Sequence, residues 1–243
     1  MHLYGLIGYP LSHSFSQKYF TEKFEKENIT NCRYQNYPIS TIDEIKKIID
    51  QNPDLKGLNV TIPYKEKVIP YLNEITEAVK KIGACNCIKF TNGKLIGYNT
   101  DVTGFEKSFI KKLKPFHNAA MVLGTGGASK AVQYVLHKLN IPFIIVSRTP
   151  QKNEMSYHNL DENTFKRCKI IINTSPLGMQ PNVQQSPSIP YLNITNQHYL
   201  FDLIYNPAKS VFLEKGELMG ASIQNGYEML VNQAEESWQI WNS

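Results

Sequence analysis

No stretch of this sequence is apolar over the roughly 18 residues that a membrane-spanning helix needs, so we expect no membrane segment. Cysteine is scarce. Four cysteines in 243 residues suit a reducing compartment, where they remain thiols and build no disulfide framework. The six histidines are dispersed without a His-x-x-x-His pair, and no Gly-x-Ser-x-Gly motif is present. We therefore predict no metal site, and serine-hydrolase chemistry has no support.

The sequence also lacks a leader-like start and a strong charge imbalance. Met1 leads straight into a strand-like segment, with neither a basic region nor an apolar core of a signal peptide, so we expect a cytoplasmic protein. Lys and Arg number 26 against 21 Asp and Glu, a formal net charge of +5. The densest basic stretch, at 107–114, is typical of a solvated helix face. We predict no nucleic-acid partner, and the small positive excess suits small anionic ligands.

What the sequence does contain is a regular alternation of strand-like and helix-like segments. The 42% hydrophobic and 19% charged residues are enough for a packed core. The alternation predicts an α/β fold with mostly parallel sheets. A new unit begins after Pro115, so we expect two α/β halves with a ligand cleft between them. We expect strands at 3–8, 33–37, 57–61, 84–90, 95–98, 119–123, 143–146, 169–173 and 199–204. We expect helices at 14–27, 41–50, 76–82 and 101–113, then from the glycine cluster to 140, and from 227 to 238 or beyond. Asn92-Gly93 predicts a two-residue hairpin turn, and 176–190, with its four prolines, a loop.

A glycine-rich loop stands where a strand is expected to pass into a helix. The segment is Gly-Thr-Gly-Gly-Ala-Ser-Lys-Ala at 124–131, directly after an apolar strand. Gly124 would allow the tight turn, Gly126 would let the backbone approach a pyrophosphate, and Ala131 would allow close packing of helix on strand. Amides at the helix N-terminus would meet the phosphate charge. The pattern predicts dinucleotide binding, against the plainer alternative of a tight strand-to-helix turn.

The end of the next expected strand, at 143–146, indicates which dinucleotide is bound. An NAD-preferring site places Asp or Glu there for the ribose 2′-hydroxyl, and no acid is present. Ser147 and Arg148 occupy the position, with Lys152 close behind. Because a guanidinium forms paired hydrogen bonds to a phosphate, we predict NADP rather than NAD. The alternative is that Arg148 is an ordinary surface cation.

Polar residues gather at strand ends and helix starts in the first half. Ser14 and Ser16 could offer two hydroxyls to a carboxylate, and helix capping by one of them is the equally open alternative. Alternation along the third strand places Asn59 and Thr61 on one face. Lys65, just past that strand, could act as a general acid, although a lone lysine is more simply solvent-exposed.

Asp101 follows the hairpin and is expected to cap the helix at 101–113. An aspartate beside Lys65 would hold the ammonium group in place and help to bind substrate hydroxyls. Cys85 and Cys87 are expected to share one face of a strand. Without a second pair of Cys or His at ligand spacing, they do not predict a zinc site.

Taken in order, these motifs resemble the shikimate dehydrogenase family over essentially the whole chain. The first half carries Gly-Tyr-Pro-Leu-Ser-His-Ser-Phe-Ser at 8–16, Asn-Val-Thr-Ile-Pro-Tyr-Lys at 59–65, Gly-Ala-Cys-Asn at 83–86 and Asn-Thr-Asp at 99–101. The second half carries Gly-Thr-Gly-Gly at 124–127, Ser-Arg-Thr-Pro-Gln-Lys at 147–152 and Asn-Thr-Ser-Pro-Leu-Gly-Met at 173–179. Segments 202–207 and 229–234 are similar to the family's C-terminal motifs. So many motifs in register make the resemblance highly specific.

The resemblance implies NADPH-dependent, reversible reduction of 3-dehydroshikimate to shikimate, on the route to chorismate and the aromatic amino acids. It implies a substrate domain of residues 1–101 plus 222–243 and a Rossmann-type NADP domain of residues 102–221, in a monomer or homodimer. The implied catalytic pair is Lys65 and Asp101. The implied substrate-binding residues are Ser14, Ser16, Thr61, Asn86, Tyr205 and Gln233. The implied cofactor-binding residues are Gly124, Gly126, Gly127, Ala128, Ser147, Arg148, Thr149, Lys152, Thr174, Leu203 and Gly226.

The sequence departs from the family pattern in places. Cys87 stands where Thr is usual, which would remove a hydroxyl near the substrate, Ser147 stands for the more usual Asn, and Gln17 stands where Pro is common. The chain is also somewhat short, which predicts trimmed loops. Two alternatives stay open: a dehydrogenase that also uses quinate, and a catalytically silent NADP-binding sensor, against which the intact Lys65 and Asp101 argue.

Overall fold

A computed structural model describes residues 1–11 and 14–243 and divides them into two compact units. The first unit comprises Met1–Thr100 together with Ala234–Ser243, and the second comprises Asp101–Gln233. Within the described residues, each unit is built on one six-stranded sheet covered by helices. The predicted α/β fold with mostly parallel sheets is confirmed.

The first sheet mixes parallel and antiparallel pairing. Its strands are β1 (His2–Gly8), β2 (Cys32–Pro38), β3 (Leu55–Val60), β4 (Glu74–Ile75), β5 (Cys87–Thr91) and β6 (Lys94–Tyr98), in the order β2-β1-β3-β5-β6-β4. Only the β5 pairings, with β3 and with β6, are antiparallel among the described strands. Asn92 and Gly93 join β5 to β6 with φ values of 50° and 72°, as the predicted hairpin requires.

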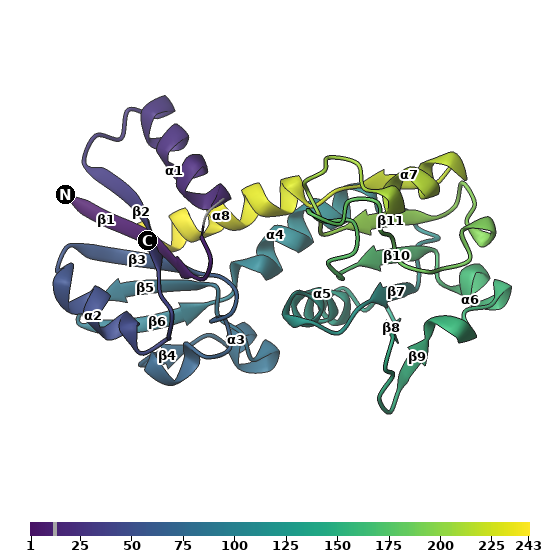
Figure 1. The fold of residues 1–243 in the computed structure, drawn as a ribbon, viewed down its shortest axis with the longest axis horizontal. Coiled ribbons are helices and arrows are strands. Elements are labelled where there is room, and N and C mark those ends of the chain that lie inside the picture. Colours follow the sequence, from purple (N-terminus) through teal and green to yellow (C-terminus); the bar gives the residue numbers. More distant parts are fainter. Residues whose placement is uncertain (12–13) are drawn as a thin grey trace. The chain divides into compact units, whose positions relative to one another are not determined.

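Helices bury both faces of the first sheet, and β1 sends alternate side chains to the two sides. Leu3 and Ile7 join a core with α2 (Glu44–Gln51) and α3 (Glu77–Ile82). Tyr4 and Leu6 join a second core with α1 (Phe15–Lys26) and the end of α8 (Tyr227–Asn242). In Figure 1, α8 is the yellow helix whose C-terminal end lies beside β1.

Trp241 closes the second of these cores by lying directly on the backbone of β3. Its ring stacks on Tyr4 at 4.9 Å between centroids, and its Nε1 donates to the Ile88 carbonyl at 3.0 Å. A Cβ added to Gly57 would lie 2.1 Å from the Trp241 Nε1. Glycine at position 57 is therefore a packing requirement, and Trp241, near the C-terminal end of α8, is an integral part of the core formed with α1.

Replacing Gly57 by alanine should lower the free energy of unfolding by about 1–3 kcal/mol, the usual cost of forcing atoms into a packed core. The indole cannot shift without losing its hydrogen bond to Ile88. Urea unfolding followed by tryptophan fluorescence measures the loss. Lys56→Ala, at the exposed neighbour on the same strand, should change the midpoint little. Equal midpoints for the two variants would contradict this account of Gly57.

The second sheet is entirely parallel. Its strands are β7 (Ala120–Leu123), β8 (Phe143–Ser147), β9 (Glu154–Ser156), β10 (Ile170–Asn173), β11 (Tyr199–Asp202) and β12 (Ser222–Gln224). The spatial order is β12-β11-β10-β7-β8-β9, most of which can be followed in Figure 1. Counted from β7, this is the 3-2-1-4-5-6 order of a doubly wound dinucleotide-binding sheet. The strand order reverses between β7 and β10, where such sheets bind their ligands.

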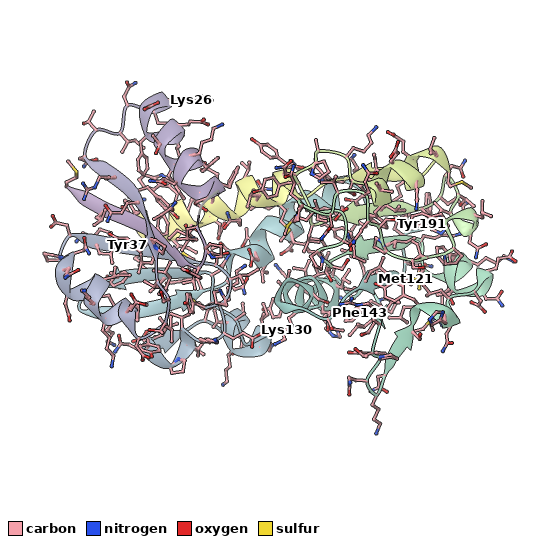
Figure 2. The ribbon with its side chains drawn as sticks, in the orientation of Figure 1. Lys26, Tyr37, Met121, Lys130, Phe143 and Tyr191 are labelled. Carbon is pink, nitrogen blue, oxygen red and sulfur yellow. The ribbon has the colours of Figure 1, made fainter. Side chains whose placement is uncertain are left out.

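Helices cover both faces of this second sheet. Met121 and Leu123 of β7 face a core that includes Phe165 of α6 (Glu162–Arg167) and Phe212 of α7 (Val211–Leu218). On the other face, α4 (Thr100–Phe109) brings Phe105 to Phe201 of β11, with ring centroids 5.1 Å apart. The buried side of α5 (Gly127–Lys138) is formed by Ser129, Ala131, Val132, Val135 and Leu136. Figure 2 labels Met121 and Phe143 on the neighbouring strands β7 and β8.

Several elements differ from the sequence prediction. The helix expected at 101–113 ends at Phe109 and continues as a short 3-10 turn over Ile110–Lys112. The capping role predicted for Asp101 is wrong, because α4 begins at Thr100 and Asp101 lies in its first turn. The sequence pattern did not predict β4, β9, β12, α6 or α7. No helix in the described part of the chain is long and apolar enough to cross a membrane.

Candidate active site

The glycine loop predicted to receive a phosphate joins β7 to α5 at the switch point of the second sheet. Gly124 has a φ of +109°, and a Cβ there would lie 3.0 Å from the Thr174 Oγ1. Gly126 precedes α5 with no side-chain cap, and a Cβ on Gly126 or Gly127 would enter open space. The first amides of α5 therefore carry no side chain that would block them, so a phosphate can approach the positive end of the helix.

Ser129 holds this loop in shape. Its side chain is fully buried, and its Oγ donates to the Gly124 carbonyl at 2.8 Å. Ser129 was not among the predicted cofactor residues, whereas its neighbour Ala128, half-buried at the start of α5, was. A serine at the start of a helix is common, so the sequence alone does not distinguish the hydrogen bond from Ser129 to Gly124 from ordinary helix capping.

A cavity of about 250 Å³ lies beside the glycine loop. Its walls come from the glycine loop, the end of β8 and the loop after β10, and they bring together six predicted cofactor residues: Gly124, Gly126, Ser147, Arg148, Thr149 and Thr174. Among the described residues that line it, Arg148 alone carries a charge. A cavity with one guanidinium and no carboxylate suits an anionic ligand.

The turn after β8 presents Arg148 outward. Ser147 is buried, and its Oγ accepts a hydrogen bond from the Thr149 amide at 3.3 Å, which closes the turn. Arg148 is exposed beside Tyr157, whose pKa is raised by burial and lowered in part by the guanidinium charge. Tyr157 also lines the cavity, and it was not predicted from the sequence because it follows the unpredicted strand β9.

The remaining predicted cofactor residues lie outside the cavity lining. Lys152 is exposed in the turn before β9, and Gly127 and Ala128 start α5. Leu203 and Gly226 pack on one another, since a Cβ on Gly226 would lie 2.1 Å from the Leu203 carbonyl oxygen. Gly226 also donates its amide to the Ile204 carbonyl at 3.0 Å. Glycine at 226 is thus needed for close backbone packing.

In the first unit, Ser14 starts α1. Its Oγ accepts a hydrogen bond from the Gln17 amide at 3.3 Å, so the predicted alternative of helix capping is confirmed for this serine. Capping uses a lone pair of the oxygen and leaves the hydroxyl proton available for donation. One side chain can therefore both cap α1 and donate to a carboxylate. The neighbouring Ser12 and His13 lie outside the described residues.

Ser16 is half-buried and stands at one end of a chain of hydrogen bonds along the face of the first sheet that α1 and α8 cover. The Tyr34 hydroxyl hydrogen-bonds Ser16 and donates to the Asn59 Oδ1 at 2.9 Å. Asn59 in turn donates its Nδ2 to the Ser237 Oγ at 2.9 Å. Burial raises the pKa of Tyr34, which keeps this link neutral. Tyr34 was not predicted as a site residue because it belongs to none of the sequence motifs.

Asn86 fixes the start of α4. Its Oδ1 accepts from the Thr100 amide at 2.6 Å, and its Nδ2 donates to the Thr100 Oγ1 at 3.0 Å. This pair explains why the helix begins at Thr100, one residue before the predicted cap. The first turn of α4 then contains Asp101, which is half-buried.

Thr61 and Lys65 lie in the turn that follows β3. The Thr61 amide donates to the Ile7 carbonyl at 3.0 Å, and the Lys65 carbonyl accepts from the Cys85 amide at 2.7 Å. Both side chains are partly exposed. The backbone around Lys65 is therefore held on two sides, by β1 and by the segment before β5.

The other predicted catalytic and substrate residues belong to the second unit. Gln233 is 8% exposed on α8, where its Nε2 donates to the Leu230 carbonyl at 2.9 Å. A Cβ on Gly104 of α4 would lie 3.0 Å from the Gln233 Cβ, so glycine lets the two helices meet. Tyr205 is 37% exposed after β11. Lys65 and Asp101 fall in different units, and their pairing stays a prediction.

The two cysteines near Asn86 do not share a strand face. The strand begins at Cys87 rather than at residue 84, and Cys85 joins the core of α2 and α3 while Cys87 joins that of α1 and α8. Burial raises the pKa of the Cys87 thiol well above its usual range. Cys87 is a core residue. No cluster of His, Cys, Asp or Glu suited to a metal ion occurs in the described ranges 1–11 and 14–243.

The doubly wound sheet, the glycine loop without a side-chain cap and the cavity that contains Arg148 are the features of a dinucleotide-binding protein. A sequence profile described as the shikimate dehydrogenase substrate binding domain matches residues 6–88. A relative from Methanosphaera stadtmanae, named shikimate dehydrogenase (NADP(+)), is 35% identical and aligns over 98% of this chain and 90% of its own length. The chain belongs to the shikimate dehydrogenase family.

Solved structures are similar along the same length. A chorismate mutase/shikimate 5-dehydrogenase fusion protein from Clostridium acetobutylicum is 36% identical with a TM-score of 0.88, over 100% of this chain and 91% of that one. A shikimate dehydrogenase in complex with NADP+ is 30% identical with a TM-score of 0.87, over 99% of this chain and 90% of that one.

Proposed function

We propose that this chain catalyses the reversible reduction of 3-dehydroshikimate to shikimate with NADPH. The observation that carries the proposal is the coincidence of two sites in one chain. The second unit has an open glycine loop beside a cavity whose charged residue is Arg148. The first unit matches the substrate-binding profile of the family and carries its polar motif residues.

NADPH, when bound, supplies the hydride that reduces the substrate carbonyl carbon. The Lys65 ammonium donates a proton to the carbonyl oxygen as the alkoxide develops, so the products are the alcohol, NADP+ and a neutral amine. In the reverse direction the amine accepts the hydroxyl proton. Asp101 orients the ammonium and accepts a hydrogen bond from a substrate hydroxyl.

Cofactor binding falls to the second unit. The glycine loop and the amides of α5 would receive the pyrophosphate, and Ser147, Arg148, Thr149 and Lys152 would hold the 2′-phosphate. The residues present fit this group, because the space beside Gly126 and Gly127 is open and the nearby guanidinium is exposed.

Substrate binding falls mainly to the first unit. Ser14 and Ser16, with Tyr205, bind the carboxylate, while Thr61, Asn86 and Gln233 contact ring hydroxyls or the carboxylate edge. The proposed substrate domain comprises residues 1–101 and 222–243, and the proposed NADP domain comprises 102–221. We place the reaction in the cytoplasm, whose reducing conditions suit four cysteine thiols.

The deciding experiment mixes the protein with shikimate and NADP and follows the absorbance of the reduced nicotinamide. We expect a steady rise with shikimate and NADP, and a much slower rise when NAD replaces NADP. Binding of NADP without any turnover would favour the silent sensor. A comparable rate with quinate would favour the dual-specificity dehydrogenase.

Changing both Ser14 and Ser16 to alanine should raise the Michaelis constant for shikimate about 150-fold or more, because each of the two lost hydrogen bonds to a charged group contributes roughly 1.5–3 kcal/mol. The affinity for NADP should stay unchanged. Loss of the cap on α1 should also lower the stability by about 1 kcal/mol, so a drop in melting temperature alone decides nothing.

Ser14→Asp separates the two roles of this serine. Aspartate is as good a cap as serine, but its charge repels a carboxylate. We expect normal melting temperature and poor shikimate binding. A variant with both properties normal would show that Ser14 only caps the helix.

A further inference from the structure

Asp202 is a buried carboxylate to which the proposed reaction assigns no task. It ends β11 with a fully buried side chain, and burial raises its pKa to about 6. Its Oδ1 accepts from the Ile204 amide at 3.0 Å and from the Asn173 Nδ2 at 3.0 Å. Its Oδ2 accepts from the Ser210 hydroxyl. Three donors converge on one carboxylate, which therefore joins the ends of two strands to the start of α7.

Asn173 carries this connection to the wall of the cavity. It ends β10, fully buried, and its Oδ1 accepts from the Ser175 amide at 3.1 Å and from the Ser175 hydroxyl at 2.7 Å. Ser175 and Leu177 both line the cavity beside the glycine loop. Ser175 in turn accepts a hydrogen bond from the Leu177 amide at 3.4 Å.

The carboxylate is the nearer of two acceptors that determine which way the Asn173 amide faces, because the Nδ2 also donates to the Leu177 carbonyl at 3.4 Å. An ionised carboxylate only accepts hydrogen bonds, so the Nδ2 of Asn173 must point to Asp202 and its Oδ1 must point to Ser175. Without the carboxylate, a flipped amide would direct its Nδ2 at the Ser175 amide, donor against donor. The turn at 174–177 would then lose the acceptor that shapes it.

We propose that Asp202 is a positioning residue for the nucleotide site, which acts through Asn173 to fix the turn 174–177 that walls the cavity. This inference rests on the proposed function, because it assumes that the cavity receives NADP. The same carboxylate fixes the backbone of Ile204, between the predicted cofactor residue Leu203 and the predicted substrate residue Tyr205. The nucleotide site then includes, besides the residues that would contact NADP, the pair Asp202 and Asn173, which holds the backbone of those residues in place.

The test measures NADP affinity by direct titration, without substrate, in a set of variants. Asp202→Ala and Asn173→Ala should each weaken NADP binding about tenfold, which is 1.4 kcal/mol. Since the two residues act in series, the double variant should bind no more weakly than the worse single variant. Asp202→Asn keeps an acceptor oxygen for Asn173 and Ile204 and should restore most of the affinity.

Ser210→Ala is the matched control. It removes one donor to Asp202 and the N-cap of α7, so it should lower the melting temperature while NADP affinity stays within about twofold. At saturating NADP, the turnover number of the Asp202 variants should be close to that of the unchanged protein. A purely structural role would instead make NADP affinity follow melting temperature across all variants, Ser210→Ala included.

The outcomes separate this inference from the proposed function. Failure of the unchanged protein to bind NADP would overturn both. Normal NADP binding by a folded Asn173→Ala variant would overturn the inference alone, and so would additive losses in the double variant. If Asp202→Ala does not fold, Asn173→Ala and Asp202→Asn carry the test, with amide hydrogen exchange at 174–177 as the direct readout of the turn.

Discussion

Turnover should fall by about 10²–10⁴-fold when Lys65 is replaced by alanine, the range that positioned acid–base groups contribute. The lysine acts on the proton that moves in the transition state, so the Michaelis constant for shikimate should change much less than the turnover number. The turn that carries Lys65 is held by backbone hydrogen bonds at Thr61 and at Lys65 itself. Truncating the side chain should therefore leave the fold intact.

Lys67→Ala is the control for this experiment, because Lys67 is an exposed lysine of the same turn. Asp101→Ala should lower turnover and also weaken shikimate binding, since the carboxylate is proposed to hold a hydroxyl. If Lys65 and Asp101 act as one unit, the double variant should be little worse than the worse single variant. Near-normal turnover of Lys65→Ala between pH 6 and 9 would mean that another group moves the proton.

The second large effect is expected on the cofactor side. Arg148→Ala should raise the Michaelis constant for NADP by about 10- to 150-fold, corresponding to roughly 1.5–3 kcal/mol for a charged hydrogen-bond pair. The use of NAD, which lacks the 2′-phosphate, should be nearly unchanged. Steady-state kinetics with both cofactors, at saturating shikimate, measure the two constants.

A matched control for Arg148 is Arg167→Ala, an exposed arginine at the end of α6. It removes the same charge from the same unit without altering the cavity lining. Equal losses with NADP and NAD in Arg148→Ala would mean that the arginine supports the fold of the turn rather than selecting the 2′-phosphate. An effect of Arg167→Ala as large as that of Arg148→Ala would point to long-range charge instead.

The strands and helices predicted correctly are those with a strong local pattern. The uninterrupted apolar runs of β7 and β10 and the apolar spacing along α8 determine their own structure. The missed strands β9 and β12 are three-residue edge strands whose pairing depends on neighbours remote in sequence. The missed helix α7 contains Gly216, which packs against Leu200 and weakens the helical signal.

The residues of the candidate site likewise fall into those that a local sequence pattern predicts and those that depend on the order of the strands. Gly124 and Arg148 stand out because strand, loop and helix follow one another locally, and that context is readable from the sequence. Tyr34 and Asn59 meet only because β1 lies between β2 and β3, an order that no local pattern reveals. The link between Asp202 and Asn173 likewise depends on the pairing of β10 with β11.

The first unit is discontinuous, and this bears on the order in which a nascent chain can fold. Its second core needs Trp241 and Ala234, and its buried polar chain needs Ser237, all from the segment that follows the second unit along the chain. The second unit is one uninterrupted stretch, so it can complete its core before residues 234–243 are synthesised. Domains generally fold from the N-terminus onward during synthesis. Here the first unit cannot complete its second core until residues 234–243 have been synthesised. Until then the apolar side of β1 that Trp241 covers stays open to chaperones and to aggregation.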